Sequence, residues 1–393
     1  TPKPLTFSSV QDLLGPREGL VLISRAWDDD KNHVFVVRDG SHKVYTVDIG
    51  ADAVKDAVNE LRRGIDLSGV QSVDDLPRFN TSVAYRLYRD LLGPAEETLA
   101  GADHVFFVVD GALGSLPIGV LVTEEPAPGA RYGDIAWLAK RYAATTLPSV
   151  SSLRALRTFA KRGKASKPFI GFGDPDLGRA GVKLARATRG FAVRNELPET
   201  ADELRSIASA LGASNDNIYL SSKATETMVK GTDLDPYRIV AFATHGLMAG
   251  EQAGLPEPAL VLTPPAKATQ ADDGLLTASE IAQLKLNAEW VLLSACNTAS
   301  GDTPNAAGLS GLAKAFFYAG SRALLVSHWP VESQATVTLV TGMFKTLAND
   351  NTIGRSEALR QSMLDLMDDP KHAHRAHPAF WAPFVVVGEG KRG

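Results

Sequence analysis

The segment VLLSACNTASG, residues 291–301, contains the only cysteine of this 393-residue chain. Four apolar residues, 290–293, lead into Ser294, Ala295 and Cys296, and the sequence then turns polar and contains a glycine. This pattern predicts a short buried strand that ends just before a loop. A cysteine at that point is either a small buried filler or a nucleophile, and the residues around it bear on the choice.

Further strands with helices between them are predicted around this segment. Short apolar runs rich in β-branched and aromatic residues occupy 167–174, 238–246, 321–329 and 380–388. Helical spacing separates them, and residues 309–320 end on Gly320, a suitable helix stop. Two helix starts carry the pattern of a capping box, Thr200 with Glu203 and Thr277 with Glu280. The second half is therefore expected to be an α/β layered fold.

The first half has the same alternation after an antiparallel opening. Strands are expected at 19–27, 33–40 and 41–50, with a hairpin turn at Asp39–Gly40, and a continuous apolar strand at 104–111; helices are expected at 51–63, 82–99 and 151–162. The basic segment KRGKASK, 161–167, is interpreted as a solvated connector. It divides the chain into domains 1–165, with the β-hairpin region in 1–80, and 166–393.

Composition excludes several classes of function. A net charge of −4 with both signs interspersed leaves no basic surface, so a nucleic-acid partner is not expected. One cysteine cannot form an internal disulfide, which favours a reducing compartment and a cytoplasmic location. No run approaches the roughly 18 apolar residues of a membrane span. No signal peptide is visible in the first residues, so no membrane association is predicted.

The chemistry is expected at the carboxyl ends of two strands. His245 and Gly246 follow one apolar run and Cys296 follows the next, with His245 and Cys296 51 residues apart. Caspases place their histidine about 50 residues before their cysteine. We expect the two strands to be adjacent and parallel in one sheet, because this separation accommodates a crossover helix. An imidazole on the neighbouring strand end can then activate the thiol. The backbone N–H groups of Gly246 and Cys296 can together form an oxyanion hole.

Several blocks of the sequence resemble the CHAT domain, a caspase-like family often found behind tetratricopeptide repeats. The blocks are HVFFVVDGALGSLPIGVL, WLAKRYAATTLPSVSSL, RIVAFATHG, PALVLTP, DDGLLTASEIAQLKLNAEWVLLSACNTASG, GLSGLAKAFFYAGSRALLVSHWPVES and HPAFWAPFVVVG. The resemblance runs from about residue 82 to the end. It implies a caspase-like sheet with flanking helices, in which His245 and Cys296 are the catalytic pair. Resemblance to separase and its relatives implies that the first half is a pseudo-protease-like α/β partner of the catalytic half. No repeat region is recognised here, which leaves substrate recruitment and regulation open.

Other motifs are weaker. His328, in SHWP, is an alternative base, although a structural role in forming the cleft is the preferred interpretation. His372, His374 and His377 are interpreted as part of a solvated loop rather than as a metal site. The glycines of GFGDPDLG form a turn rather than a dinucleotide motif, and there is neither a P-loop nor a G-x-S-x-G motif.

The sequence therefore predicts a cysteine endopeptidase that cleaves a protein substrate and needs no cofactor. Cys296 would be the nucleophile and His245 the general base and then acid. The alternative is a catalytically silent CHAT scaffold that binds partners, and an acyl transferase or non-peptide hydrolase using the same pair is a third possibility. A regulatory repeat domain or partner upstream is a possible addition.

The resemblance to caspase-like enzymes also implies where the substrate side chain before the cleaved bond would bind. The segments in question here are GDPD and SHWPVES, which supply Asp174, Asp176 and Glu332 as acceptors for a basic side chain. Trp329 could instead form the wall of an apolar pocket. The alternative interpretation makes these carboxylates ordinary turn and helix-cap groups.

Overall fold

The computed structural model describes residues 5–25, 31–67, 69–159, 165–177, 198–247, 249–250, 255–269, 271–294, 307–329, 333–350 and 352–391. Its contacts divide the chain into two compact units. Unit 1 draws its described residues from Thr1–Phe159 and Thr338–Gly393, and unit 2 from Ala160–Asp302 and Ala307–Val337. The pseudo-protease relation of the two sequence domains, 1–165 and 166–393, stays a prediction.

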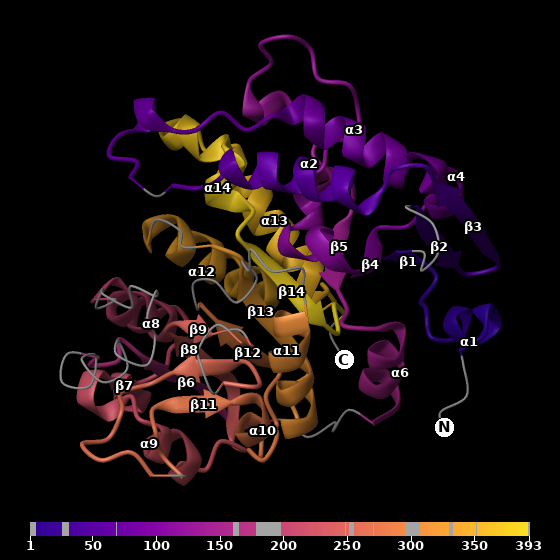
Figure 1. The fold of residues 1–393 in the computed structure, drawn as a ribbon. Helices are drawn as coiled ribbons and strands as arrows, with labels where there is room; N and C mark the ends of the chain where they lie inside the picture. Colours follow the sequence, from indigo (N-terminus) through magenta and orange to yellow (C-terminus); the bar gives the residue numbers. More distant parts are fainter. Residues whose placement is uncertain are drawn as a thin grey trace. The chain divides into compact units, whose positions relative to one another are not determined.

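Unit 1 contains a mixed sheet with the strand order β3-β2-β1-β4-β5-β14 (Figure 1). The strands are β1 (Glu18–Arg25), β2 (Asn32–Arg38), β3 (Ser41–Val47), β4 (His104–Val109), β5 (Ala143–Thr146) and β14 (Phe384–Gly388). β1, β2 and β3 pair antiparallel, whereas β4, β5 and β14 continue the sheet in parallel from β1. The two-residue turn between β2 and β3 confirms the predicted hairpin, because Gly40 has the positive φ of 70° that such a turn requires.

The helices predicted at 51–63 and, over its described residues, at 151–162 are confirmed, whereas the short helices at 7–11, 138–141 and 378–381 were not predicted. The helices of unit 1 are α1 (Phe7–Gln11), α2 (Ala51–Arg63), α3 (Thr81–Leu91), α4 (Glu96–Leu99), α5 (Leu138–Arg141), α6 (Val150–Phe159), α13 (Arg355–Met367) and α14 (Pro378–Trp381). Short 3₁₀ turns are η1 (Val73–Asp75), η2 (Gly93–Ala95), η3 (Gly111–Ser115), η4 (Ile118–Val120), η5 (Tyr132–Asp134) and η8 (Pro370–Ala376). The prediction of one helix over 82–99 was wrong, because η2 separates α3 from α4 at Pro94, which has no backbone N–H to continue the helix.

Unit 2 contains the parallel sheet that the second half of the sequence predicts (Figure 1). Its strands are β6 (Lys167–Gly173), β7 (Ile218–Leu220), β8 (Tyr237–Ala243), β12 (Trp290–Leu293) and β13 (Ala323–Ser327). The order is β13-β12-β8-β6-β7, and every neighbouring pair is parallel. A separate antiparallel sheet has β10 (Ala259–Val261) between β9 (Gly246–Leu247) and β11 (Leu275–Thr277). The α/β class with a mostly parallel sheet is confirmed.

Helices flank this sheet and pack against its apolar side chains. They are α8 (Pro198–Ala210), α9 (Glu226–Gly231), α10 (Ala278–Ile281) and α11 (Ala307–Ala319), with 3₁₀ turns η6 (Asn215–Asn217) and η7 (Ser221–Lys223); α12 (Ser333–Asn349) leads the chain from unit 2 into unit 1. The rings of Phe172 and Phe242 stack at 5.5 Å, and Phe316 of α11 lies 5.7 Å from Phe242. Gly320 ends α11 with a φ of 115°, where a Cβ would overlap the carbonyl oxygen of Leu286.

No helix within the described residues is both long and apolar enough to cross a bilayer.

Candidate active site

The strands that precede the two candidate catalytic residues are neighbours in unit 2. β8 and β12 are parallel, and Phe242 pairs with Leu293 at their carboxyl ends. The N–H of Ser294 donates to the carbonyl of Phe242 at 3.0 Å, which extends the pairing past the strand. His245 is three residues beyond Phe242, and Cys296 is three residues beyond Leu293. The predicted adjacency of the two strands is confirmed, while Cys296 itself lies outside the described residues.

The backbone around His245 is fixed by the small antiparallel sheet. The N–H of Val261 donates to the carbonyl of His245 at 2.8 Å, and the hydroxyl of Thr244 donates to the carbonyl of Val261. Gly246 pairs with Leu260 across β9 and β10. His245 is half-buried, whereas Thr244 and Gly246 are buried. The imidazole therefore belongs to a partly accessible residue whose backbone is held by hydrogen bonding to β10.

The loop after β6 has a strained backbone next to this edge of the sheet. Asp174 and Ser221 both have a φ of 48°, which is uncommon for residues other than glycine. Their conformations are locked together, since the N–H of Ser221 donates to the carbonyl of Asp174 at 2.9 Å and the Ser221 hydroxyl donates to the Asp174 carboxylate at 3.0 Å. Strained residues of this kind cluster at functional sites. The Asp174 carboxylate, predicted as a substrate-binding group, accepts a hydrogen bond within the protein.

The other predicted pocket residues lie in different environments. Asp176 is exposed, and its N–H donates to the hydroxyl of Thr263 at 2.8 Å. Trp329 follows β13 and is buried, with its carbonyl accepting from the Ser327 hydroxyl at 2.7 Å. Glu332 lies outside the described residues. His328, the alternative base, is buried beside Trp329 with 3% of its surface exposed, so the half-buried His245 is the more accessible imidazole.

A buried acid, Glu203, accepts a hydrogen bond from Ser294, the last described residue before Cys296. The capping box expected of Thr200 and Glu203 does not form, because the helix begins earlier, at Pro198, and both side chains have tertiary partners. Thr200 accepts from the N–H of Asp174 at 3.1 Å, and Glu203 accepts from the Ser294 hydroxyl. The second predicted box, Thr277 with Glu280, is confirmed. Burial raises the pKa of Glu203 to about 7, although the hydrogen bond from Ser294 works in the opposite direction.

Most of the chain matches one protein family. The model of the CHAT domain family matches residues 81–389, which is most of the chain. The chain belongs to the CHAT domain family. Mouse tetratricopeptide repeat protein 28 is 32% identical over 114 residues, covering 29% of this chain and 4% of that protein, and the human protein of the same name is 31% identical over 114 residues with the same coverage. The chain thus matches only a small part of these much longer relatives.

A solved structure supports the fold of this CHAT domain. The separase–securin complex of Saccharomyces cerevisiae contains a chain that superposes with a TM-score of 0.51 at 9% identity. The match covers 97% of the CHAT chain and 30% of that chain. At this identity the likeness establishes the architecture, which is the caspase-like one that the sequence predicts.

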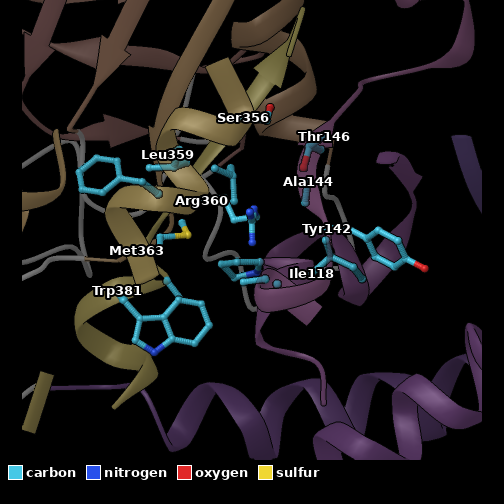
Figure 2. A pocket seen from close by; sticks show the side chains of 15 residues that line it. Ile118, Tyr142, Ala144, Thr146, Ser356, Leu359, Arg360, Met363 and Trp381 are labelled. Carbon is cyan, nitrogen blue, oxygen red and sulfur yellow. The ribbon is translucent and has the colours of Figure 1, made fainter. Parts of the chain in front are cut away.

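Unit 1 of the CHAT domain has a pocket of its own (Figure 2). It is mostly apolar, and its lining residues are Pro117, Ile118, Gly119, Ala139, Tyr142, Ala144, Thr146, Ser356, Leu359, Arg360, Met363, Trp381, Ala382, Phe384 and Val385. Arg360 extends into it and donates to the Glu357 carboxylate at 2.7 and 2.8 Å and to the carbonyl of Lys140 at 3.1 Å. None of the predicted site residues lines this pocket.

The histidine-rich segment of the CHAT domain is only partly the solvated loop that was expected. The side chain of His372 is partly exposed, and its Nδ1 lies 2.7 Å from the Asp369 carboxylate. His377 is buried, with 3% of its surface exposed, and its Nε2 lies 2.8 Å from the carbonyl of Pro77. Burial lowers the pKa of His377 to about 4. For His377 the expectation was wrong, because this ring caps α14 by accepting from the N–H of Ala379.

Glu203 gives a prediction for the pH dependence of stability. Folding raises its pKa from 4.5 to about 7, so the folded state binds this proton more tightly and the ionised carboxyl destabilises the fold. The cost grows from about pH 4.5 to 7 and reaches roughly 3 kcal/mol above that range. Relative to the native chain, Glu203→Gln should therefore gain stability as pH rises, as measured by urea unfolding between pH 5 and 8.

The control for this measurement is Asp202→Asn, since Asp202 is an exposed neighbour on the same helix. A stability difference between Glu203→Gln and the native chain that stays constant across this pH range would contradict the raised pKa.

Proposed function

We propose that this CHAT domain is a cysteine endopeptidase that cleaves a protein substrate through Cys296 and His245. The observation that carries the proposal is the parallel pairing of β8 with β12, with Phe242 opposite Leu293. Because each candidate residue is three positions beyond this pair, the two motifs start from the same edge of one sheet. Membership of the CHAT family supports a caspase-like peptidase, and the finer assignment of the dyad is the proposal.

Each group has a defined role in the proposed reaction. His245 takes the proton of the Cys296 thiol, and the thiolate attacks the carbonyl carbon of the scissile peptide bond. The oxyanion that forms accepts hydrogen bonds from the N–H groups of Gly246 and Cys296. His245 then gives its proton to the departing amine as the C–N bond breaks, leaving a thioester. A water molecule, deprotonated by His245, hydrolyses the thioester and returns the enzyme.

The rest of the protein is assigned supporting roles in this proposal. The first half, residues 1–165, is the pseudo-protease-like partner of the catalytic half, residues 166–393. A repeat region or separate partner would recruit the substrate, a role suggested by the similarity to a tetratricopeptide repeat protein over 114 residues. The dyad itself requires no cofactor.

The test is an unbiased cleavage profile of a peptide library, compared between the native chain and Cys296→Ala. The proposal expects defined cleavage products that vanish in the variant. The rival function, a catalytically silent CHAT scaffold that binds partners, expects no products from either chain. Products that persist in Cys296→Ala would contradict the assignment of the nucleophile.

The same library tests the acidic pocket proposed from Asp174, Asp176 and Glu332. If these carboxylates receive the substrate, peptides with Arg or Lys before the cut should be processed faster than those with Leu or Met. Asp174→Asn and Asp176→Asn should each reduce that preference. Equal processing of basic and apolar peptides would instead favour an apolar pocket beside Trp329.

A further inference from the structure

Glu203 is an acid in an unusual place. Its side chain is buried, with 8% of the residue exposed, and the Ser294 hydroxyl donates to its carboxyl group. Within the described residues no basic side chain forms an ion pair with it. A buried carboxyl without a cation is costly, and a neutral amide could accept the same hydrogen bond at lower cost. A carboxyl group that is expensive to bury, held on α8 against the residue that follows β12, points to a role besides packing.

The position of Ser294 connects this acid to the proposed nucleophile. Ser294 immediately follows β12, and its N–H continues the pairing with Phe242. Cys296 is two residues further along the chain. The Glu203–Ser294 hydrogen bond therefore anchors the last described residue before the cysteine segment to helix α8.

The same helix also anchors the loop after β6. Thr200 and Glu203 are three residues apart, which places them on one face of α8. Thr200 accepts from the N–H of Asp174, just past β6, while Glu203 accepts from Ser294, just past β12. β8, which leads to His245, lies between these two strands. One face of α8 thus forms hydrogen bonds with the residues that follow β6 and β12, the two neighbours of β8.

We infer that Glu203 is a positioning residue for Cys296, holding the end of β12 through Ser294 so that the thiol stays at working distance from His245. This inference rests on the proposed function. Small displacements of reacting groups are expensive, since an error of about 1 Å costs on the order of 10² in rate. The hydrogen bond to a rigid helix restricts the start of the segment that carries the nucleophile.

The experiment compares four variants of the full chain: Glu203→Met, Glu203→Gln, Ser294→Ala and the double variant Glu203→Met/Ser294→Ala. Each is assayed for the alkylation rate of Cys296 by iodoacetamide, for kcat and KM on a library-derived peptide, and for thermal unfolding. Asp202→Asn is the matched control on an exposed position of α8.

Glu203→Met and Ser294→Ala should each lower kcat and the alkylation rate about tenfold or more, with KM little changed. The double variant should be no slower than the worse single variant, because both remove one interaction. Glu203→Gln keeps an acceptor for the Ser294 hydroxyl and should recover most of the rate, and the thermal unfolding of each variant separates this rescue from a change in stability.

Two results would overturn the inference, and they are distinguishable. If Cys296 is reactive in a His245-dependent way but the Glu203 and Ser294 variants react at the native rate, or their losses multiply, the positioning role is wrong and the dyad stands. If Cys296 of the native chain is alkylated at the rate of an ordinary thiol, and if His245→Ala does not change that rate, both the proposed function and the positioning role of Glu203 are wrong.

Discussion

Replacing His245 by alanine is expected to lower the rate of peptide cleavage by about 10² to 10⁴ without unfolding the protein. The variant keeps the Cys296 thiol but removes the base that converts it to the thiolate. His245 is half-buried, and its backbone hydrogen bond with Val261 does not depend on the side chain, so the fold should persist. The measurement is kcat/KM on a library-derived peptide, with thermal unfolding as the check of folding.

Cys296→Ala is the reference for this experiment and should have essentially no turnover. His328→Gln is a second control, because His328 is a buried imidazole of the same unit that the proposal does not use as base. Cleavage that survives in His245→Ala but is lost in His328→Gln would show that His328, and not His245, is the base.

The second large effect concerns the stability of unit 1, where Arg157→Ala is expected to cost roughly 3–5 kcal/mol of unfolding free energy. Arg157 of α6 donates to the Glu18 carboxylate at 2.8 and 2.9 Å and to the Glu389 carboxylate at 3.0 and 3.1 Å. Glu18 is 1% exposed. Burial alone would raise the pKa of Glu18, but hydrogen bonds from His104 and Arg157 outweigh it and hold that pKa well below its usual range.

Loss of Arg157 therefore leaves the buried carboxylate of Glu18 with the N–H of Gly15 at 2.6 Å and two longer contacts, His104 at 3.5 Å and the half-exposed Lys391 at 3.4 Å. Guanidinium chloride unfolding measures the loss. The control is Arg131→Ala, because the ion pair of Arg131 with Asp134 is exposed and should contribute under about 1 kcal/mol. Similar losses in the two variants would contradict the importance of the buried network.

Patterns in the sequence predicted the elements that dominate the fold. Continuous apolar runs gave β4 and β12 because both faces of these strands are buried, and no alternation is then needed. Asp39–Gly40 predicted its hairpin because few other residue pairs tolerate that turn. The neighbouring positions of β8 and β12 followed from the length of chain between the two motifs and the preference for parallel crossovers.

Features that depend on distant partners were beyond the sequence. Thr200 and Glu203 have the spacing of a capping box, but their partners, Asp174 and Ser294, lie 26 and 91 residues away in the chain. The pairing of β9 with β10 involves two residues of β9, which is too short for a strand pattern. The pairing of β14 with β5 likewise joins residues far apart in the chain, such as Val386 with Thr145. The break at Pro94 is different, because a proline within a helical pattern was a visible signal.

The central claim, that Cys296 and His245 form a working pair, is tested most directly by the rate of Cys296 alkylation with iodoacetamide as a function of pH. Because Cys296 is the only cysteine, the whole signal reports on this thiol. In the native chain, a thiolate stabilised by His245 should react rapidly near neutral pH, with a profile shifted below that of an ordinary thiol of pKa about 8.5. In His245→Ala the reaction should slow near neutral pH and the profile should return towards that value. Native and variant profiles that coincide, both typical of an unperturbed thiol, would contradict the account.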